Sequence, residues 1–155
     1  SPVAAALWLV NVMFALSGLG PGSLFGTCHE YFHLWNVKRI RSASLGPFDY
    51  TQLPRTGALW WLEGVTDYYA HLIPYRYGAV DRELFLREVG RQIAAVRRNP
   101  ARLEVSPYES SARVAEATGR FSSGYRVDYY PTGFLLGLLL DIEIRSRTDG
   151  ARSLD

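Results

Sequence analysis

The chain has 155 residues, of which 48% are hydrophobic and 21% are charged. This length suits one domain that buries roughly two-thirds of the surface its unfolded form exposes, and the composition excludes a disordered or collagen-like protein. The net charge of +2 comes from interspersed basic and acidic residues without a basic stripe, which argues against a nucleic-acid-binding protein.

Residues 1–26 form an apolar segment that ends in a Gly/Pro loop. No basic residue precedes the apolar run, which Asn11 interrupts and which is shorter than the ~20 residues that a membrane-spanning helix needs. We therefore expect a buried helix or strand, and neither a signal peptide nor a membrane span. Because the sequence starts abruptly in apolar residues and stops at "SLD", we expect the rest of a longer polypeptide to be a partner of this chain.

Residues 27–155 are predicted to form a mainly α-helical domain. Ser23 is a suitable cap for a first helix that runs to about Val37. Residues 38–57 contain two prolines and two glycines and indicate a long irregular connection. Further helices are expected over residues 58–78 (closed by Pro74 and Gly78), 81–99 (capped by Asp81), 106–120 (short and weak) and 131–147 (buried all round in its first half), with a loop or brief strand at residues 121–130.

The sole cysteine, Cys28, excludes an intrachain disulfide and a cysteine-rich zinc site. Any zinc must therefore be bound by histidines and carboxylates. A single thiol suits the cytoplasm and the periplasm equally, so the compartment stays open. Lys38 is the only lysine among the 17 basic residues, which indicates a high-GC genome, and we expect a bacterial protein.

The stretch "TCHEYFHLW" places His29 and His33 four residues apart, with Glu30 beside the first of them. On a helix, positions four apart are about 5 to 6 Å from each other on one face, which allows two imidazoles to bind one zinc ion. Glu30 lies where a carboxylate could take a proton from a water activated by that metal. The alternative is a helix with two core or surface histidines, and the motif alone does not exclude it.

A third ligand is suggested by "LWWLEGVTDYY", where Glu63 follows four apolar residues. A carboxylate in an apolar setting needs a partner, and a His, His, Glu set leaves a fourth zinc position open, as catalytic sites require. Asp67 follows one helical turn later and could accept a hydrogen bond from the outer nitrogen of a ligand histidine. The alternatives are an exposed helix acid at Glu63 and a surface acid at Asp67. His71 falls off the metal face and is expected to pack or to lie at the surface.

Five segments resemble, in order, the glycyl aminopeptidase family of gluzincin metallopeptidases: "HEYFHLWNVKRIR", "PFDYT", "LWWLEGVTDYY", "DYYPTGFLLGLLLDIEIR" and "SLD". The resemblance covers Thr27 to Asp155. It implies a gluzincin-like helical zinc subdomain in which an active-site helix and a glutamate helix pack with further helices. Because residues 1–26 match none of the family's upstream strands, we expect the upper β-sheet to be largely absent.

The resemblance also implies roles for single residues. One Zn²⁺ per chain would be bound by His29, His33 and Glu63, with Asp67 supporting a histidine ligand. Glu30 would be the general base. Tyr130 would donate a hydrogen bond to the oxyanion, with Tyr129 as the rival, and we expect the following proline to keep Tyr130 outside the last helix. Thr132 stands where the family normally has lysine.

The leading functional hypothesis is a zinc aminopeptidase that favours small amino-terminal residues such as Gly or Ala. Three alternatives remain: a zinc-binding module without peptidase activity, an endopeptidase and a purely structural helical protein. A peptide is the expected substrate, and neither a nucleic-acid partner nor a membrane span is expected.

Overall fold

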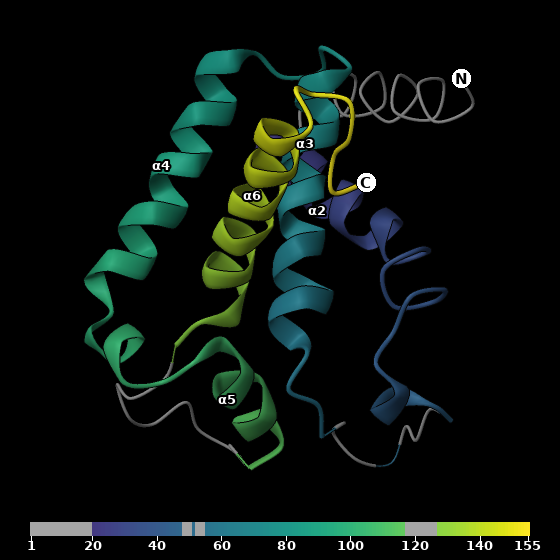
Figure 1. Ribbon diagram of the computed structural model, residues 1–155, viewed down its shortest axis with the longest axis vertical. Coiled ribbons are helices and arrows are strands. Elements are labelled where there is room, and N and C mark those ends of the chain that lie inside the picture. Colours follow the sequence, from purple (N-terminus) through teal and green to yellow (C-terminus); the bar gives the residue numbers. More distant parts are fainter. Residues whose placement is uncertain (1–19, 48–50, 52–54, 117–126) are drawn as a thin grey trace.

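The computed structural model describes residues 20–47, 51, 55–116 and 127–155 (Figure 1). The elements in this part of the chain are helical, as predicted, and outside them a single isolated bridge joins Asn36 to Ile40. The longer ones are α2 (Pro21–Phe32), the π-helix η2 (Trp60–Val65), α3 (Thr66–Arg76), α4 (Arg82–Arg98) and α6 (Tyr129–Arg147). Short helices fill the connections: η1 (Ala43–Leu45), η3 (Pro100–Leu103), α5 (Pro107–Ala112) and η4 (Arg113–Glu116).

Helix α2 begins and ends earlier than predicted. Its N-cap is Gly20 rather than Ser23, because Pro21 occupies the first turn, where a fixed φ is already helical and a missing N–H costs nothing. The helix stops at the C-cap His33 instead of Val37, whose φ of 137° cannot continue it. The helix therefore crosses the predicted boundary between residues 1–26 and 27–155. Residues 1–19 of the expected apolar segment lie outside the described part of the chain.

The helix predicted over residues 58–78 consists of two parts, η2 and α3. The expectation that Pro74 closes it was wrong, since Pro74 is buried inside α3. The proline lies in the last turn of the helix, which ends two residues later at Arg76, so the missing N–H interrupts only the end of its hydrogen-bond series. Gly78, with a φ of 73°, follows the end as predicted.

Two other expectations were confirmed. Asp81 caps α4 by accepting a hydrogen bond from Leu84 N at 2.7 Å, and the helix ends at Arg98. The weak helix is α5, which begins with a capping box in which Ser106 and Glu109 bind each other's backbone N–H groups. Both helices start where short-range side-chain bonds to the backbone define the first turn.

Helix α6 begins at Tyr129, before the proline, and Asp128 caps it through the N–H of Tyr130 at 2.9 Å. Tyr130 is therefore helical, and the expectation that it lies outside the helix was wrong. Proline is tolerated in a first turn because its N–H would have no helical partner there. The expected burial of the first half of this helix was confirmed: residues 131–138 are buried or half-buried, with Phe134 fully buried, and exposure begins at the midpoint with Leu139, which is 60% exposed.

The packing of α6 against η2 and α3 forms the centre of the fold (Figure 1). The backbones of η2 and α6 touch at two glycines: a Cβ on Gly64 would lie 2.5 Å from the Cα of Gly133. Around this contact, buried apolar side chains from η2, α3, α4 and α6 form one cluster, which includes Val65, Tyr68, Tyr69, Leu72, Phe85 and Phe134. A second cluster joins α2 to α3 through Leu24, Phe25, Cys28, Ala70 and Val80.

The C-terminal residues are held against this core by Asp141 of α6, which is 3% exposed. Its carboxylate accepts hydrogen bonds from Tyr68 Oη at 2.7 Å, Arg145 Nε at 3.0 Å and Leu154 N at 2.9 Å. Burial alone would raise the pKa of Asp141, but these donors hold it below its usual value. A buried charge is tolerated here because every neighbouring donor favours the ionised form.

Candidate metal centre

Four helices bring the predicted site residues together. The last turn and C-cap of α2 carry His29 and His33, η2 carries Glu63, and the first turn of α3 carries Asp67. The first turn of α6 adds Tyr130 from the opposite side. The Gly64–Gly133 contact lies next to Glu63, so the closest approach of two helices is also where the site is assembled.

The two histidines converge on one oxygen of Glu63. His29 Nε2 is 3.2 Å and His33 Nε2 is 3.5 Å from Glu63 Oε2. The two imidazole rings are nearly perpendicular, with centroids 4.7 Å apart. We call His29, His33 and Glu63 the His–His–Glu cluster. Its donor atoms face a common point, which is the arrangement that a metal ion requires of its ligands.

The outer nitrogens of both rings face acceptors. His29 Nδ1 is 3.5 Å from Asp67 Oδ1, and His33 Nδ1 donates to the carbonyl oxygen of Asn36 at 3.0 Å. An acceptor at Nδ1 keeps a proton there, so Nε2 is the nitrogen that gives up its proton and presents a lone pair when a metal binds. The cluster therefore offers two imidazole lone pairs and a carboxylate, a donor set that fits Zn²⁺.

The electrostatics of the cluster favour charge on each member. Burial would lower the pKa of His29, but hydrogen bonds with Asp67 and Glu63 raise it to about 9. The hydrogen bond with Glu63 likewise raises the pKa of His33. Burial opposes ionisation of Glu63, yet the two histidines lower its pKa to about 2. Glu63 is thus held as an anion, the form in which a carboxylate binds a cation.

Glu30 is the second carboxylate beside the histidines. His29, Glu30 and His33 can place one ligand atom each within 4.8 Å of one another, so this triplet is also a possible metal-binding group. Glu30 is exposed, however, whereas Glu63 is partly buried and contacts both imidazoles. The geometry favours Glu63 as the ligand and leaves Glu30 facing solvent, where a base can exchange protons.

Tyr130 contacts the cluster directly, because its hydroxyl donates to Glu63 Oε2 at 3.0 Å. Its ring centroid is 5.9 Å from that of His29, and the side chain of Tyr129 stacks on it at 5.1 Å. Burial and the negative charge of Glu63 raise the pKa of Tyr130, so the phenol stays neutral and able to donate. Thr132, one residue past the proline, bonds back to Asp128 O at 2.8 Å.

The sequence reasoning missed Asn36, which is 5% exposed. Its carbonyl accepts the His33 hydrogen bond, and its amide donates to Trp61 O at 3.0 Å and Thr66 Oγ1 at 2.9 Å. Asn36 thus ties the end of α2 to η2, next to Glu63. An asparagine after a helix is common in turns, so the sequence carried no signal of these long-range bonds.

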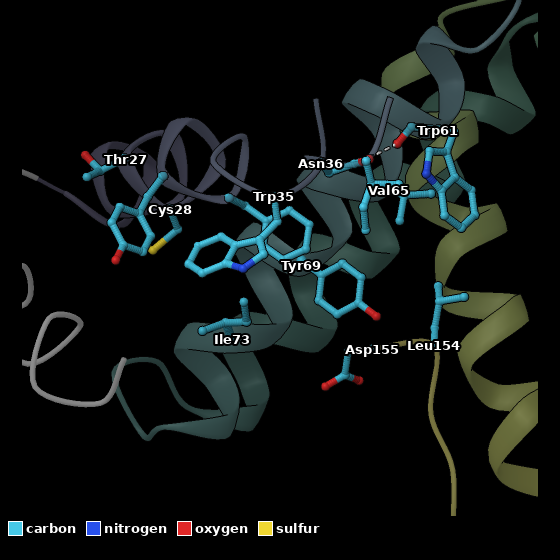
Figure 2. Close-up of a pocket in the computed structure, with 13 residues that line it drawn as sticks. Thr27, Cys28, Trp35, Asn36, Trp61, Val65, Tyr69, Ile73, Leu154 and Asp155 are labelled. Atoms are coloured by element: carbon cyan, nitrogen blue, oxygen red, sulfur yellow. Dashed lines mark hydrogen bonds between the residues drawn. The ribbon is translucent and has the colours of Figure 1, made fainter. Parts of the chain in front are cut away.

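A pocket of about 460 Å³ lies beside α2 and α3 (Figure 2). Among the lining residues labelled in Figure 2, Cys28 lies on α2, Trp35 in the turn after it, Tyr69 and Ile73 on α3, and Leu154 in the C-terminal segment. Its lining is largely apolar and includes none of His29, Glu30, His33 or Glu63. The candidate metal centre is therefore defined by converging polar atoms and not by this pocket.

Helical architecture and a His–His–Glu cluster are together typical of the zinc-binding half of a peptidase. The chain resembles the crystal structure of an aminopeptidase N family protein from Idiomarina loihiensis, with a TM-score of 0.79 and 29% identity. The match covers 86% of this chain and 23% of that one. Among curated proteins, no sequence matches the chain.

The family itself is shown by residues 24–136, which match the M61 glycyl aminopeptidases. The chain belongs to this family, as the sequence resemblance predicted. The match starts three residues before the predicted domain boundary at Thr27, and that boundary stays a prediction. Within the described residues, none of the helices combines the length and apolar character that a membrane crossing requires.

Proposed function

We propose that this chain is the zinc-binding part of an aminopeptidase that hydrolyses peptide bonds next to small amino-terminal residues. One observation carries the proposal: both Nε2 atoms of the histidine pair meet one Glu63 oxygen while both Nδ1 atoms face acceptors. Such a site could catalyse several hydrolytic reactions, and membership of an aminopeptidase family supports peptide-bond hydrolysis among them. The proposal extends to one Zn²⁺ per chain and to a bacterial protein of the cytoplasm or periplasm.

In this mechanism His29, His33 and Glu63 would hold the zinc ion, with Asp67 orienting His29. Zinc supplies Lewis acidity, which polarises a carbonyl and makes water more acidic. Glu30 accepts the proton of the attacking water and passes it to the leaving amine, so the carboxylate returns to its starting state after each cycle. The Tyr130 hydroxyl donates a hydrogen bond to the carbonyl oxygen as negative charge develops on it.

The Gly/Ala preference comes from the family resemblance. The second candidate is a zinc-binding module without peptidase activity, and the extent of the structural match favours it: the chain spans 23% of its structural neighbour. Extended peptides are commonly held by strand edges, and the described residues form no strand. The two candidates share the metal and differ only in turnover.

A zinc and substrate assay separates these candidates. We expect the purified chain to contain about one zinc per molecule and to hydrolyse Gly and Ala p-nitroanilides faster than the Leu compound. Dialysis against a chelator should abolish turnover, and added Zn²⁺ should restore it. Zinc content is measured by atomic emission. Bound zinc without cleavage of any substrate would establish the module, and cleavage of amino-blocked peptides would establish an endopeptidase. A chain purified without zinc that binds none on addition would contradict both.

The oxyanion role is tested by Tyr130→Phe, which removes the hydroxyl and keeps the ring. We expect kcat to fall by about 10²–10³-fold, as for other lost oxyanion donors, with zinc content unchanged. Tyr129→Phe is the matched control, because it removes the neighbouring hydroxyl in the same turn. A larger loss in Tyr129→Phe than in Tyr130→Phe would transfer the role to Tyr129.

A further inference from the structure

We propose that His71 is a positioning residue that holds Asp67 toward His29 and sets the spacing of α2 and α6 beside the His–His–Glu cluster. This inference rests on the proposed metal-binding function. His71 lies on α3, one helical turn after Asp67, and is 6% exposed. No hydrogen bond, ion pair or ring contact joins it to the three cluster residues, so its effect would pass through Asp67 and through the helix packing.

The first link is the contact with Asp67. His71 Nδ1 is 2.8 Å from the carbonyl oxygen of Asp67, which can only accept, so the Nδ1 atom carries the proton. The same nitrogen is 3.8 Å from Asp67 Oδ1, the oxygen that lies 3.5 Å from His29 Nδ1. Asp67 Oδ1 thus lies between two imidazoles. The positive end of the His71 N–H dipole favours the carboxylate in that position.

The second link is the ring of His71. It stacks on Phe25 of α2 with centroids 4.0 Å apart, and meets Phe134 of α6 edge-on at 5.3 Å. Phe25 precedes His29 by four residues, and Phe134 follows Tyr130 by four residues, which is one helical turn in each case. The ring therefore lies between α2 and α6 one turn away from the residues that these helices bring to the site.

Packing alone does not explain a histidine at this point. A phenylalanine would fill the same aromatic layer without burying two ring nitrogens, and burying polar atoms costs free energy. The carbonyl of Asp67 is also already the acceptor of a helical backbone bond, so a second donor there adds little stability. A histidine at this place is explained if its N–H group holds the Asp67 carboxylate toward His29.

Two variants separate the two links. His71→Phe keeps an aromatic ring between Phe25 and Phe134 but removes the donor to Asp67. We expect its metal-free melting temperature to stay near that of the wild type, while the Kd for Zn²⁺ rises about 10-fold, the lower end of the loss seen for residues that support metal ligands. His71→Asn keeps a side-chain N–H near the place of Nδ1 but removes the ring. It should melt at a lower temperature and retain a zinc Kd closer to the wild-type value.

Zinc affinity is measured by competition with a chromophoric chelator, and stability by thermal unfolding of the metal-free chain, so neither readout needs activity. A His71→Phe variant that binds Zn²⁺ as tightly as the wild type would overturn the inference. So would zinc affinity that falls in step with melting temperature in both variants, or a His71→Phe chain that does not fold, since either shows that His71 acts on the stability of the whole fold and not on the position of Asp67. If the wild type binds no zinc, the proposed function fails instead.

Discussion

Replacement of Glu30 by Gln is expected to lower kcat by about 10²–10⁴-fold, the contribution of a positioned general base. Gln keeps the size of the side chain and cannot accept the proton of the attacking water. Because Glu30 is exposed and Glu63 contacts both histidines, zinc content should stay near one per chain. KM should change little, since the lost interaction acts in the transition state.

The assay compares kcat for Gly p-nitroanilide with zinc content in the same preparation. Glu83→Gln is a suitable control, because Glu83 is an exposed acid on α4 whose ion pair with Arg87 is a surface contact. Unchanged turnover in Glu30→Gln would show that another group takes the proton. Loss of zinc together with turnover would instead make Glu30 a ligand, as the His29, Glu30 and His33 triplet allows.

Replacement of Gly133 by Ala should have the largest effect on stability. The added methyl group would overlap the carbonyl of Trp60 and approach the Cα of Gly64 to 2.8 Å, so two backbones must move apart. Backbone atoms cannot move aside as a flexible side chain can. We therefore expect the free energy of unfolding to fall by about 3 kcal/mol or more. For a chain of this size that corresponds to a melting temperature about 6 to 12 °C lower.

The same displacement should weaken zinc binding, because Gly133 and Tyr130 share one turn of α6 and Gly64 is next to Glu63. Gly90→Ala is the matched control on α4: nothing lies within 4 Å of a Cβ at that position. Alanine is the better helix former by about 0.8 to 1 kcal/mol, so this variant should be slightly more stable than the wild type. Equal melting temperatures for the two variants would contradict the close backbone contact.

Helix α4 shows what sequence pattern can predict. Its apolar positions recur at helical spacing, and Asp81 and Asn99 mark its ends through bonds that span only three residues. Such signals are local, so no knowledge of the remaining chain is needed. The mainly helical fold could be predicted for the same reason. The family could be predicted because "HEYFHLWNVKRIR" and "LWWLEGVTDYY" are long, specific segments.

Some of the errors arise from contacts between distant residues, and others from the local effect of prolines on helix ends. The α2 terminus depends on the backbone of Val37 and on bonds from Asn36 to η2, about 25 residues away. The π-helix lies against α6 more than 60 residues downstream, which no local pattern reports. Proline biased the prediction for Tyr130, although a first-turn proline permits a helix to start before it. The roles of the site residues stay predictions until the variants are measured.

The π-helical turn at η2 ties assembly of the site to cooperative stability. A π-helix has poorer hydrogen-bond geometry than an α-helix and persists where surrounding structure favours it. Here that structure is α6, which meets η2 at Gly64 and Gly133 and also carries Tyr130. Undocking of α6 would therefore release the wide turn that presents Glu63 and withdraw the tyrosine in the same opening event. We therefore expect η2 and α6 to unfold locally as one unit. Native molecules in which Glu63 is in place and Tyr130 is not, or the reverse, would then be rare.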